Sequence, residues 1–146
     1  MSEAPAGPRE RLAALGLTLP EVPAPVAAYV PAVRTGGFVY TSGQLPFVDG
    51  KLPRTGKVGA EVGVDEARDL ARICALNALA AVVSVAGDLS DIVRIVKVVG
   101  YVASAPGFTA QPQVLNGASE LLGEVFGEAG RHARSAVGVA VLPLDA

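Results

Sequence analysis

The sequence predicts an α+β domain in which two helices pack on one face of a mixed β-sheet. Two observations support this fold class: a hairpin pattern comes first, and two helix patterns follow it, each leading into an apolar strand. That order is typical of a layer of helices on a single sheet. A chain of 146 residues corresponds to about one domain, and its 51% content of hydrophobic residues is ample for one core.

The first 25 residues are expected to form an irregular arm. Six of the eleven prolines lie between Pro5 and Pro31, and proline interrupts regular structure. One short amphipathic helix is expected around residues 9–15. We therefore divide the chain into a proline-rich arm, residues 1–25, and a domain, residues 26–146.

The domain is expected to open with a hairpin. Residues 26–33 and 38–42 predict its two strands, and the glycines of residues 34–37 predict the turn between them. The stretch 49–63 is rich in glycine and lysine and contains Pro53, so we expect an exposed loop or a short third hairpin strand there.

Residues 64–86 predict a long helix. Asp65 and Glu66 place negative charge at its start, alanine and leucine dominate its middle, and Gly87 ends it. Because the middle is apolar nearly all round, we expect this helix to be buried on more than one side.

The stretch 92–104 predicts a strand that is apolar on both faces, apart from Arg94 and Lys97. Helices of the same chain can cover only one face of so small a sheet, so we expect a neighbouring subunit to cover the other. Residues 112–126 predict the second helix, and residues 134–142 predict the last strand.

Charge and composition argue against several classes of function. The net charge is −2 and the basic residues are scattered, whereas nucleic-acid binding usually needs a basic stripe, so no nucleic-acid partner is expected. The longest apolar run, residues 73–87, is shorter than the roughly 20 residues that cross a bilayer, so no membrane partner is expected. No secretory signal pattern follows Met1, and one cysteine cannot form an internal disulfide. We expect a soluble cytoplasmic protein.

Motifs for metals, cofactors and nucleophiles are scarce. One histidine and one cysteine do not supply the converging ligands of a zinc centre, and no glycine run matches a phosphate loop, so neither a metal nor a cofactor is expected. A serine hydrolase would have to use His132, but Ser42 does not lie in a nucleophile elbow. Cys74 lies on the apolar face of the long helix, which favours core packing over a reactive thiol.

Arg134 stands at the head of an otherwise uncharged strand. With the two-residue period of a strand, one face carries three valines that we expect to meet the core: Val137, Val139 and Val141. The other face carries Arg134 with small side chains: Ala136, Gly138 and Ala140. Room is thus expected beside a guanidinium, whose fixed fork of donors suits a carboxylate held by two hydrogen bonds. The alternative is an arginine that forms a structural ion pair.

Two stretches together resemble the RidA/YjgF family, also called the endoribonuclease L-PSP family. One is Gly37-Phe38-Val39-Tyr40-Thr41-Ser42-Gly43-Gln44-Leu45-Pro46, and the other is Arg134-Ser135-Ala136-Val137-Gly138-Val139-Ala140-Val141-Leu142-Pro143. Three further features support the resemblance: Tyr29 thirteen residues before Ser42, the turn Gly87-Asp88-Leu89, and Asn116. The chain is similar to a less characterised branch of that family with an extended N-terminus.

The resemblance implies a chorismate-mutase-like fold, a homotrimer, and one ligand cleft at each subunit interface. It implies that Arg134 and Tyr29 of neighbouring subunits are the catalytic pair. It also implies that the groups that bind substrate with Arg134 are Ser42, Gly43, Asn116, Ser135 and Ala136.

Each of these positions also has a plainer interpretation from the residues alone. Tyr29 equally fits a packing role, Ser42 fits a turn, and Asn116 fits a helix cap. His132 lies two residues before Arg134, where a loop or interface position is favoured over a role in the cleft.

The reaction that the resemblance implies is the hydrolysis of short-lived 2-enamine and 2-imino acids to 2-oxo acids and ammonia. Arg134 is expected to anchor the carboxylate, while orientation in a partly dry cleft supplies much of the rate. The alternative is a non-catalytic trimer, a sensor or chaperone-like protein, that binds a small carboxylate in the same cleft. Ribonuclease activity is not expected.

Two positions depart from the deaminases of that family. Ala136 stands where they carry a cysteine, at a position used largely through its backbone. They also carry a glutamate a little beyond the pair Leu142-Pro143, and the printed sequence ends at Ala146, before that position. Whether an acidic residue activates the attacking water is therefore left open, whereas the expectation that Arg134 binds a carboxylate does not depend on that glutamate.

Overall fold

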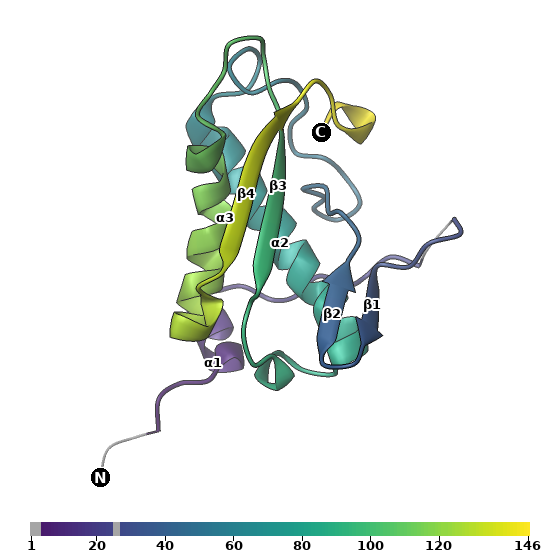
Figure 1. The fold of residues 1–146 in the computed structure, drawn as a ribbon, viewed down its shortest axis with the longest axis vertical. Helices are drawn as coiled ribbons and strands as arrows, with labels where there is room; N and C mark the ends of the chain where they lie inside the picture. Colours follow the sequence, from purple (N-terminus) through teal and green to yellow (C-terminus); the bar gives the residue numbers. More distant parts are fainter. Residues whose placement is uncertain (1–3, 25–26) are drawn as a thin grey trace.

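The computed structural model describes residues 4–24 and 27–146 (Figure 1). The helices in these ranges are α1 (Pro8–Ala14), α2 (Val64–Ala86) and α3 (Gln111–Phe126). The strands are β1 (Ala32–Thr35), β2 (Phe38–Thr41), β3 (Lys97–Ala103) and β4 (Ala133–Val139), and short 3₁₀ turns are η1 (Leu89–Asp91), η2 (Gly127–Gly130) and η3 (Pro143–Asp145). The expected boundary between arm and domain, and the expected hairpin start at Val26, lie outside the described residues.

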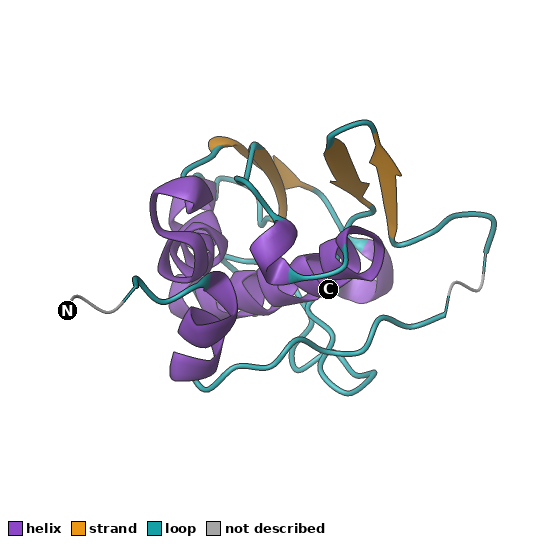
Figure 2. Ribbon diagram, turned by 90° about the horizontal axis from the view of Figure 1, so that it is seen from below, coloured by secondary structure: helices purple, strands orange, loops and turns teal. Residues whose placement is uncertain are grey.

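The helices lie on one side of the molecule and the strands on the other (Figure 2). This arrangement confirms the α+β class. β1 and β2 pair antiparallel and β3 and β4 pair parallel, but no ladder joins the two pairs within the described ranges. The expected single mixed sheet is therefore replaced by two small sheets. Residues 49–63 supply no strand to connect them, because Val58 makes only isolated bridges, one of them to Ser104.

Both long helices follow the expected pattern. α2 has the expected bounds, and α3 begins one residue earlier than expected. Gly87 ends α2 with a φ of 104°, a conformation that glycine adopts without strain. By length and composition α2 is also apolar enough to span a membrane, a test that the core helix of a soluble protein passes as well, so the expected absence of a membrane partner stays a prediction. In this fold α2 packs against α3 on one side and the β1–β2 hairpin on another.

Close packing against α2 fixes the position of α3. An added Cβ at Gly117 would lie 2.0 Å from the backbone oxygen of Arg68, so only glycine fits between the two helices there. Leu121 and Val125 of α3 are fully buried in the core. Two exposed ion pairs also join the helices: Arg68 with Glu120, and Arg72 with Glu124. The side of α3 that faces away from α2 is thereby held at a fixed position next to β4.

The faces of β4 are reversed relative to the expectation. Val137 is 44% exposed, whereas Ala136 packs against the core. The reason lies in α3, because Leu115 fills the space above Gly100, the β3 partner of Ala136. A Cβ at Gly100 would lie 2.1 Å from a methyl carbon of Leu115. The small side chains that follow Arg134 along β4 therefore admit a helix rather than a ligand.

β3 is shorter than the expected strand 92–104, since it begins at Lys97. The segment before it bonds elsewhere, with the Ile95 amide donating to the Ala129 carbonyl at 2.8 Å. The open face of the β3–β4 sheet carries Tyr101, which is 59% exposed. Cover for this face by a neighbouring subunit stays a prediction.

Candidate functional site

Arg134 lies near the start of β4 and beside α3. Its Nη1 atom donates a hydrogen bond of 2.9 Å to Oδ1 of Asn116 and one of 3.1 Å to Oγ of Ser119. The two acceptors are three residues apart on α3, a spacing that places them on one helix face. Asn116 lies inside α3, so its interpretation as a helix cap is wrong.

Two of the remaining donors of Arg134, the Nε–H and one Nη2–H, form one edge of the guanidinium. A guanidinium has five N–H donors, and Nη1 supplies the two that bind Asn116 and Ser119. Within residues 4–24 and 27–146, Nε and Nη2 have no hydrogen-bond partner, and no carboxylate pairs with Arg134. That edge has the geometry to hold a carboxylate through two parallel hydrogen bonds.

His132 extends the cluster through Ser119. Its Nε2 atom lies 2.9 Å from Oγ of Ser119, and its Nδ1 atom lies 2.6 Å from the carbonyl oxygen of Gly130. A hollow of about 330 Å³ opens over these groups. Its lining residues are Ser119, Gly123, Gly130, Arg131, His132 and Arg134. The half-buried arginine is therefore accessible to a small ligand.

Sequence reasoning did not single out Ser119. The signal was present, because Asn116 and Ser119 have the three-residue spacing of one helix face, and Asn116 was already a candidate. His132 was expected in a loop or at an interface. The structure places it between η2 and β4, hydrogen-bonded to Ser119.

Ser135 and Ala136 follow Arg134 on β4, but their side chains do not join it. The Ser135 hydroxyl lies on the open face of the sheet, where Nζ of Lys97 donates to it at 3.0 Å, and Ala136 faces the core. Their backbone groups remain candidates for binding substrate or water. Within the described ranges β4 pairs with a strand only on its β3 side, so the backbone groups on its other edge have no partner strand. Water positioning by this backbone stays a prediction.

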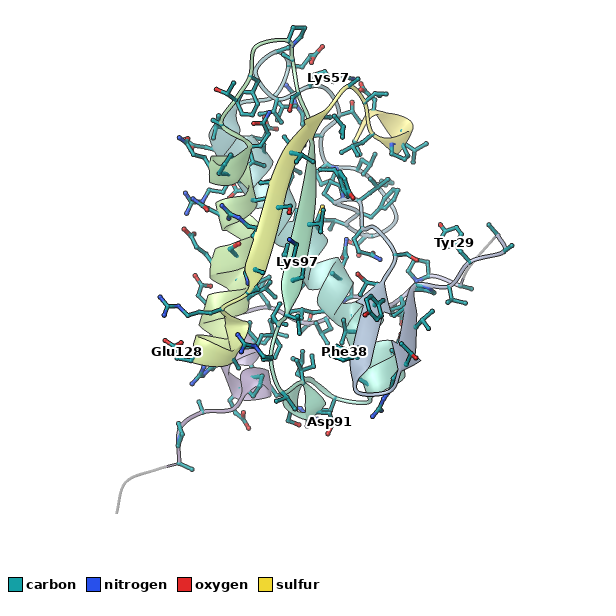
Figure 3. All side chains as sticks on the ribbon, viewed as in Figure 1. Tyr29, Phe38, Lys57, Asp91, Lys97 and Glu128 are labelled. Atoms are coloured by element: carbon teal, nitrogen blue, oxygen red, sulfur yellow. The ribbon has the colours of Figure 1, made fainter. Side chains whose placement is uncertain are left out.

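Tyr29, Ser42 and Gly43 are not brought to Arg134 within one chain. Figure 3 labels Tyr29 on the segment that leads to β1, on the other side of the molecule from α3 and β4. Tyr29 is 63% exposed, and Gly43 is also exposed. The Ser42 hydroxyl donates to the carbonyl of Val30 at 2.6 Å, a bond between the two sides of the hairpin rather than one within a turn. A meeting of these residues with Arg134 of another subunit stays a prediction.

Titratable groups outside the cluster have structural surroundings. Burial raises the pKa of the Cys74 thiol to about 12, which agrees with the expected packing role. Hydrogen bonds from Ser90, together with Arg9, hold the pKa of Asp88 well below its ordinary value. In the part of the chain that the structure describes, no three His, Cys, Asp or Glu residues gather to hold a metal ion.

Comparison with known proteins gives consistent matches. A family model described as "YjgF/chorismate_mutase-like, putative endoribonuclease" matches residues 9–146. Protein TCP17 of Trypanosoma cruzi is 46% identical over 133 residues, which are 90% of this chain and 83% of that protein. A structure from Shewanella oneidensis, titled a putative endoribonuclease, has a TM-score of 0.91 at 41% identity and covers 96% of this chain and 93% of its own. The structure of E. coli TdcF with bound serine has a TM-score of 0.60 at 28% identity and covers 86% of this chain and 85% of its own.

Proposed function

The chain belongs to the YjgF/chorismate mutase-like family, and we propose that it is a 2-enamine/2-imine deaminase that hydrolyses small 2-imino acids to 2-oxo acids and ammonia. Arg134 binds the substrate carboxylate in this proposal. The observation that carries it is the guanidinium held at Nη1 by Asn116 and Ser119, while Nε and Nη2 have no hydrogen-bond partner and no carboxylate pairs with it in residues 4–24 and 27–146.

The substrate class follows from the chemistry of that edge. A planar pair of N–H donors matches the two oxygens of a carboxylate. The neighbour TdcF was crystallised with bound serine, which carries such a carboxylate. The hollow of about 330 Å³ suits a ligand of a few heavy atoms.

The reaction asks little of the protein beyond orientation. A proton reaches C3 of the enamine, water adds to C2 of the resulting imine, and the carbinolamine releases ammonia to leave the 2-oxo acid. Arg134 fixes the carboxylate so that C2 lies at a constant position, and the outer edge of β4 at Ser135 and Ala136 orients the water. Placing substrate and water together supplies most of the acceleration in this account.

The complete site is proposed to form between subunits of a homotrimer. Arg134 and Asn116 lie at β4 and α3, while Tyr29 and Ser42 lie beside the hairpin on another side of the chain. The exposed apolar face of the β3–β4 sheet, with Tyr101, offers a surface for a second copy. In this arrangement Tyr29 of one subunit completes the cleft at Arg134 of the next.

Charge supports a small carboxylate rather than RNA as the ligand. The net charge is −2, and within residues 4–24 and 27–146 six of the twelve basic side chains pair with a carboxylate. Such pairs leave less free positive charge for a phosphate backbone, which nucleic-acid binding requires. We therefore propose no nucleic-acid partner, and we propose a cytoplasmic location.

Release of 2-oxobutyrate tests the proposed reaction. A threonine dehydratase generates the enamine, and the purified protein should speed formation of the 2-oxo acid, whereas the Arg134→Ala variant should not. Arg131→Ala is the matched control, because Arg131 lines the same hollow but its guanidinium pairs with Glu128. Formation of 2-oxobutyrate at the same rate with and without the protein would reject the deaminase. Binding of 2-oxobutyrate without any rate effect would support the non-catalytic alternative.

A further inference from the structure

Asn77 ties the segment that follows β2 to the helix layer. It lies in the middle of α2, and its Nδ2 atom donates hydrogen bonds to the carbonyl oxygens of Leu45, at 3.0 Å, and Phe47, at 3.1 Å. Carbonyl oxygens only accept hydrogen bonds, so the NH₂ group of the amide must face them, and both of its protons are used. One half-buried side chain therefore fixes two points of a segment that lies 30 to 32 residues earlier in the chain.

The segment 43–47 makes few other hydrogen bonds. It belongs to no helix or strand, and one backbone bond of 2.9 Å lies within it, from the Phe47 N–H to the Leu45 carbonyl. The Gln44 side chain donates to the carbonyl of the neighbouring Ser42 at 3.2 Å. Within residues 4–24 and 27–146, Asn77 is thus the one residue beyond this neighbour that hydrogen-bonds to the segment.

Gly43 begins this segment with a backbone donor that is free to meet a ligand. It is exposed, and its N–H has no hydrogen-bond partner in the part of the chain that the structure describes. The residue before it, Ser42, is held to the hairpin through its N–H, which donates to the Pro31 carbonyl at 2.8 Å, and through its hydroxyl. Gly43 therefore lies between a residue fixed by the hairpin and a segment fixed by α2, and both determine where its N–H points.

We propose that Asn77 is a positioning residue of the ligand site, whose two hydrogen bonds hold the segment 43–47 so that the Gly43 N–H meets the carboxylate bound by Arg134 of a neighbouring subunit. The inference rests on the proposed carboxylate site at Arg134. Asn77 itself does not touch the ligand. It contributes because an exposed backbone donor adds most to affinity when its direction is set before the ligand arrives.

Asn77→Leu tests the inference with a side chain of similar size. Leucine has no donor for the Leu45 and Phe47 carbonyls, and it adds no charge that would itself repel a carboxylate. Pyruvate affinity, measured by calorimetry, should fall roughly tenfold, as expected when a donor to a charged group is no longer held in place. Ser84→Ala is the matched control, because it removes a half-buried hydroxyl that bonds only to the Ala81 carbonyl of the same helix, and it should bind as the wild type does.

Gly43→Pro separates positioning from a purely structural role. Proline removes the Gly43 N–H, and an added Cβ at this position meets no atom within 4 Å. This variant should also lose pyruvate affinity. Asn77→Leu added to Gly43→Pro should then change affinity by less than about twofold, because no donor is left to position. A structural role for Asn77 predicts the same loss in both backgrounds.

The outcomes separate this inference from the proposed function. Wild-type affinity in a folded Asn77→Leu protein, or equal losses with and without Gly43→Pro, would overturn the role of Asn77 and leave the carboxylate site standing. No pyruvate binding by the wild-type protein would overturn both. Amide exchange followed by NMR gives a second check that needs no proline. Pyruvate should protect the Gly43 amide in the wild type and not in Asn77→Leu, and the absence of protection in the wild type, or equal protection in both, would also overturn the inference.

Discussion

Arg134 and Asn116 lie 18 residues apart in the chain, and a 2.9 Å hydrogen bond from Nη1 to Oδ1 joins them. The bond ties the start of β4 to the middle of α3, the helix that packs closely on α2. Because Asn116 and Ser119 both accept hydrogen bonds from Nη1, they set the plane of the guanidinium. The arginine is therefore oriented before any ligand arrives.

Asn116→Ala should weaken carboxylate binding without unfolding the protein. Removal of the Asn116 amide leaves Ser119 alone to orient Arg134, and a hydrogen bond to a charged group contributes about 1.5–3 kcal/mol. We expect pyruvate affinity to fall at least roughly tenfold in calorimetry. Gln113→Ala, an exposed substitution on the same helix, is the control and should bind as the wild type does. Equal affinity in both variants would show that Asn116 does not orient Arg134.

Gly117→Ala should destabilise the fold, whereas Gly123→Ala should not. A Cβ at Gly117 would lie 2.0 Å from the Arg68 backbone oxygen, so α2 and α3 would have to separate, at a cost of about 1–3 kcal/mol or more. Gly123 is on the same helix and has open space around its added Cβ, so alanine there should stabilise by up to about 1 kcal/mol. Thermal unfolding of the two variants measures the difference. Similar melting temperatures would contradict the close approach of the helices.

The wild-type protein should be a trimer in solution, with a mass of three 14.7 kDa chains. Tyr101→Glu should lower this mass, because it places a charge on the open apolar face of the β3–β4 sheet. Gln113→Glu, on the exposed surface of α3, should leave the mass unchanged. Light scattering coupled to size exclusion decides the matter. A wild-type monomer at micromolar concentration would contradict the proposed interfacial site.

Asp88→Asn should destabilise the protein at neutral pH and have a smaller effect at pH 2.5. Bonds from Ser90 and Arg9 lower the pKa of the Asp88 carboxyl in the folded state, so the ionised form favours folding. That stabilisation is fully present above the ordinary aspartate pKa of about 3.9, and it is lost as the pH falls toward the lower folded-state value. Melting temperatures of both proteins at pH 7 and pH 2.5 test this. A difference in melting temperature between the two proteins that is larger at pH 2.5 than at pH 7 would contradict this account of Asp88.

The two long helices could be predicted from the sequence because their signals are local. The acidic start at Asp65, the apolar middle and Gly87 are sufficient to bound α2. The faces of β4 could not be predicted, because they depend on Leu115, which comes from a helix outside the strand and occupies the space above Gly100. A row of small residues is equally compatible with a ligand and with a closely packed helix.

The candidate site was predictable only in part, for the same reason. Arg134 and Asn116 were both singled out, and the structure joins them. Ser119 was missed because its partners come from β4 and from the segment after η2, and its three-residue spacing from Asn116 does not by itself reveal them. Tyr29 lies on another side of the chain, and the role proposed for it depends on contacts between subunits, which a single chain does not contain.

Pyruvate affinity in Arg134→Ala, measured beside the oligomeric state of the same variant, tests the central claim most directly. The loss of a charge-assisted pair should cost roughly 2–5 kcal/mol of binding while the assembly stays intact. Arg134→Lys should restore little, because an ammonium lacks the planar fork of donors. Lost assembly together with lost binding would indicate that Arg134 is a structural ion-pair residue between subunits. Unchanged pyruvate affinity in an intact Arg134→Ala assembly would contradict the site proposed for this protein.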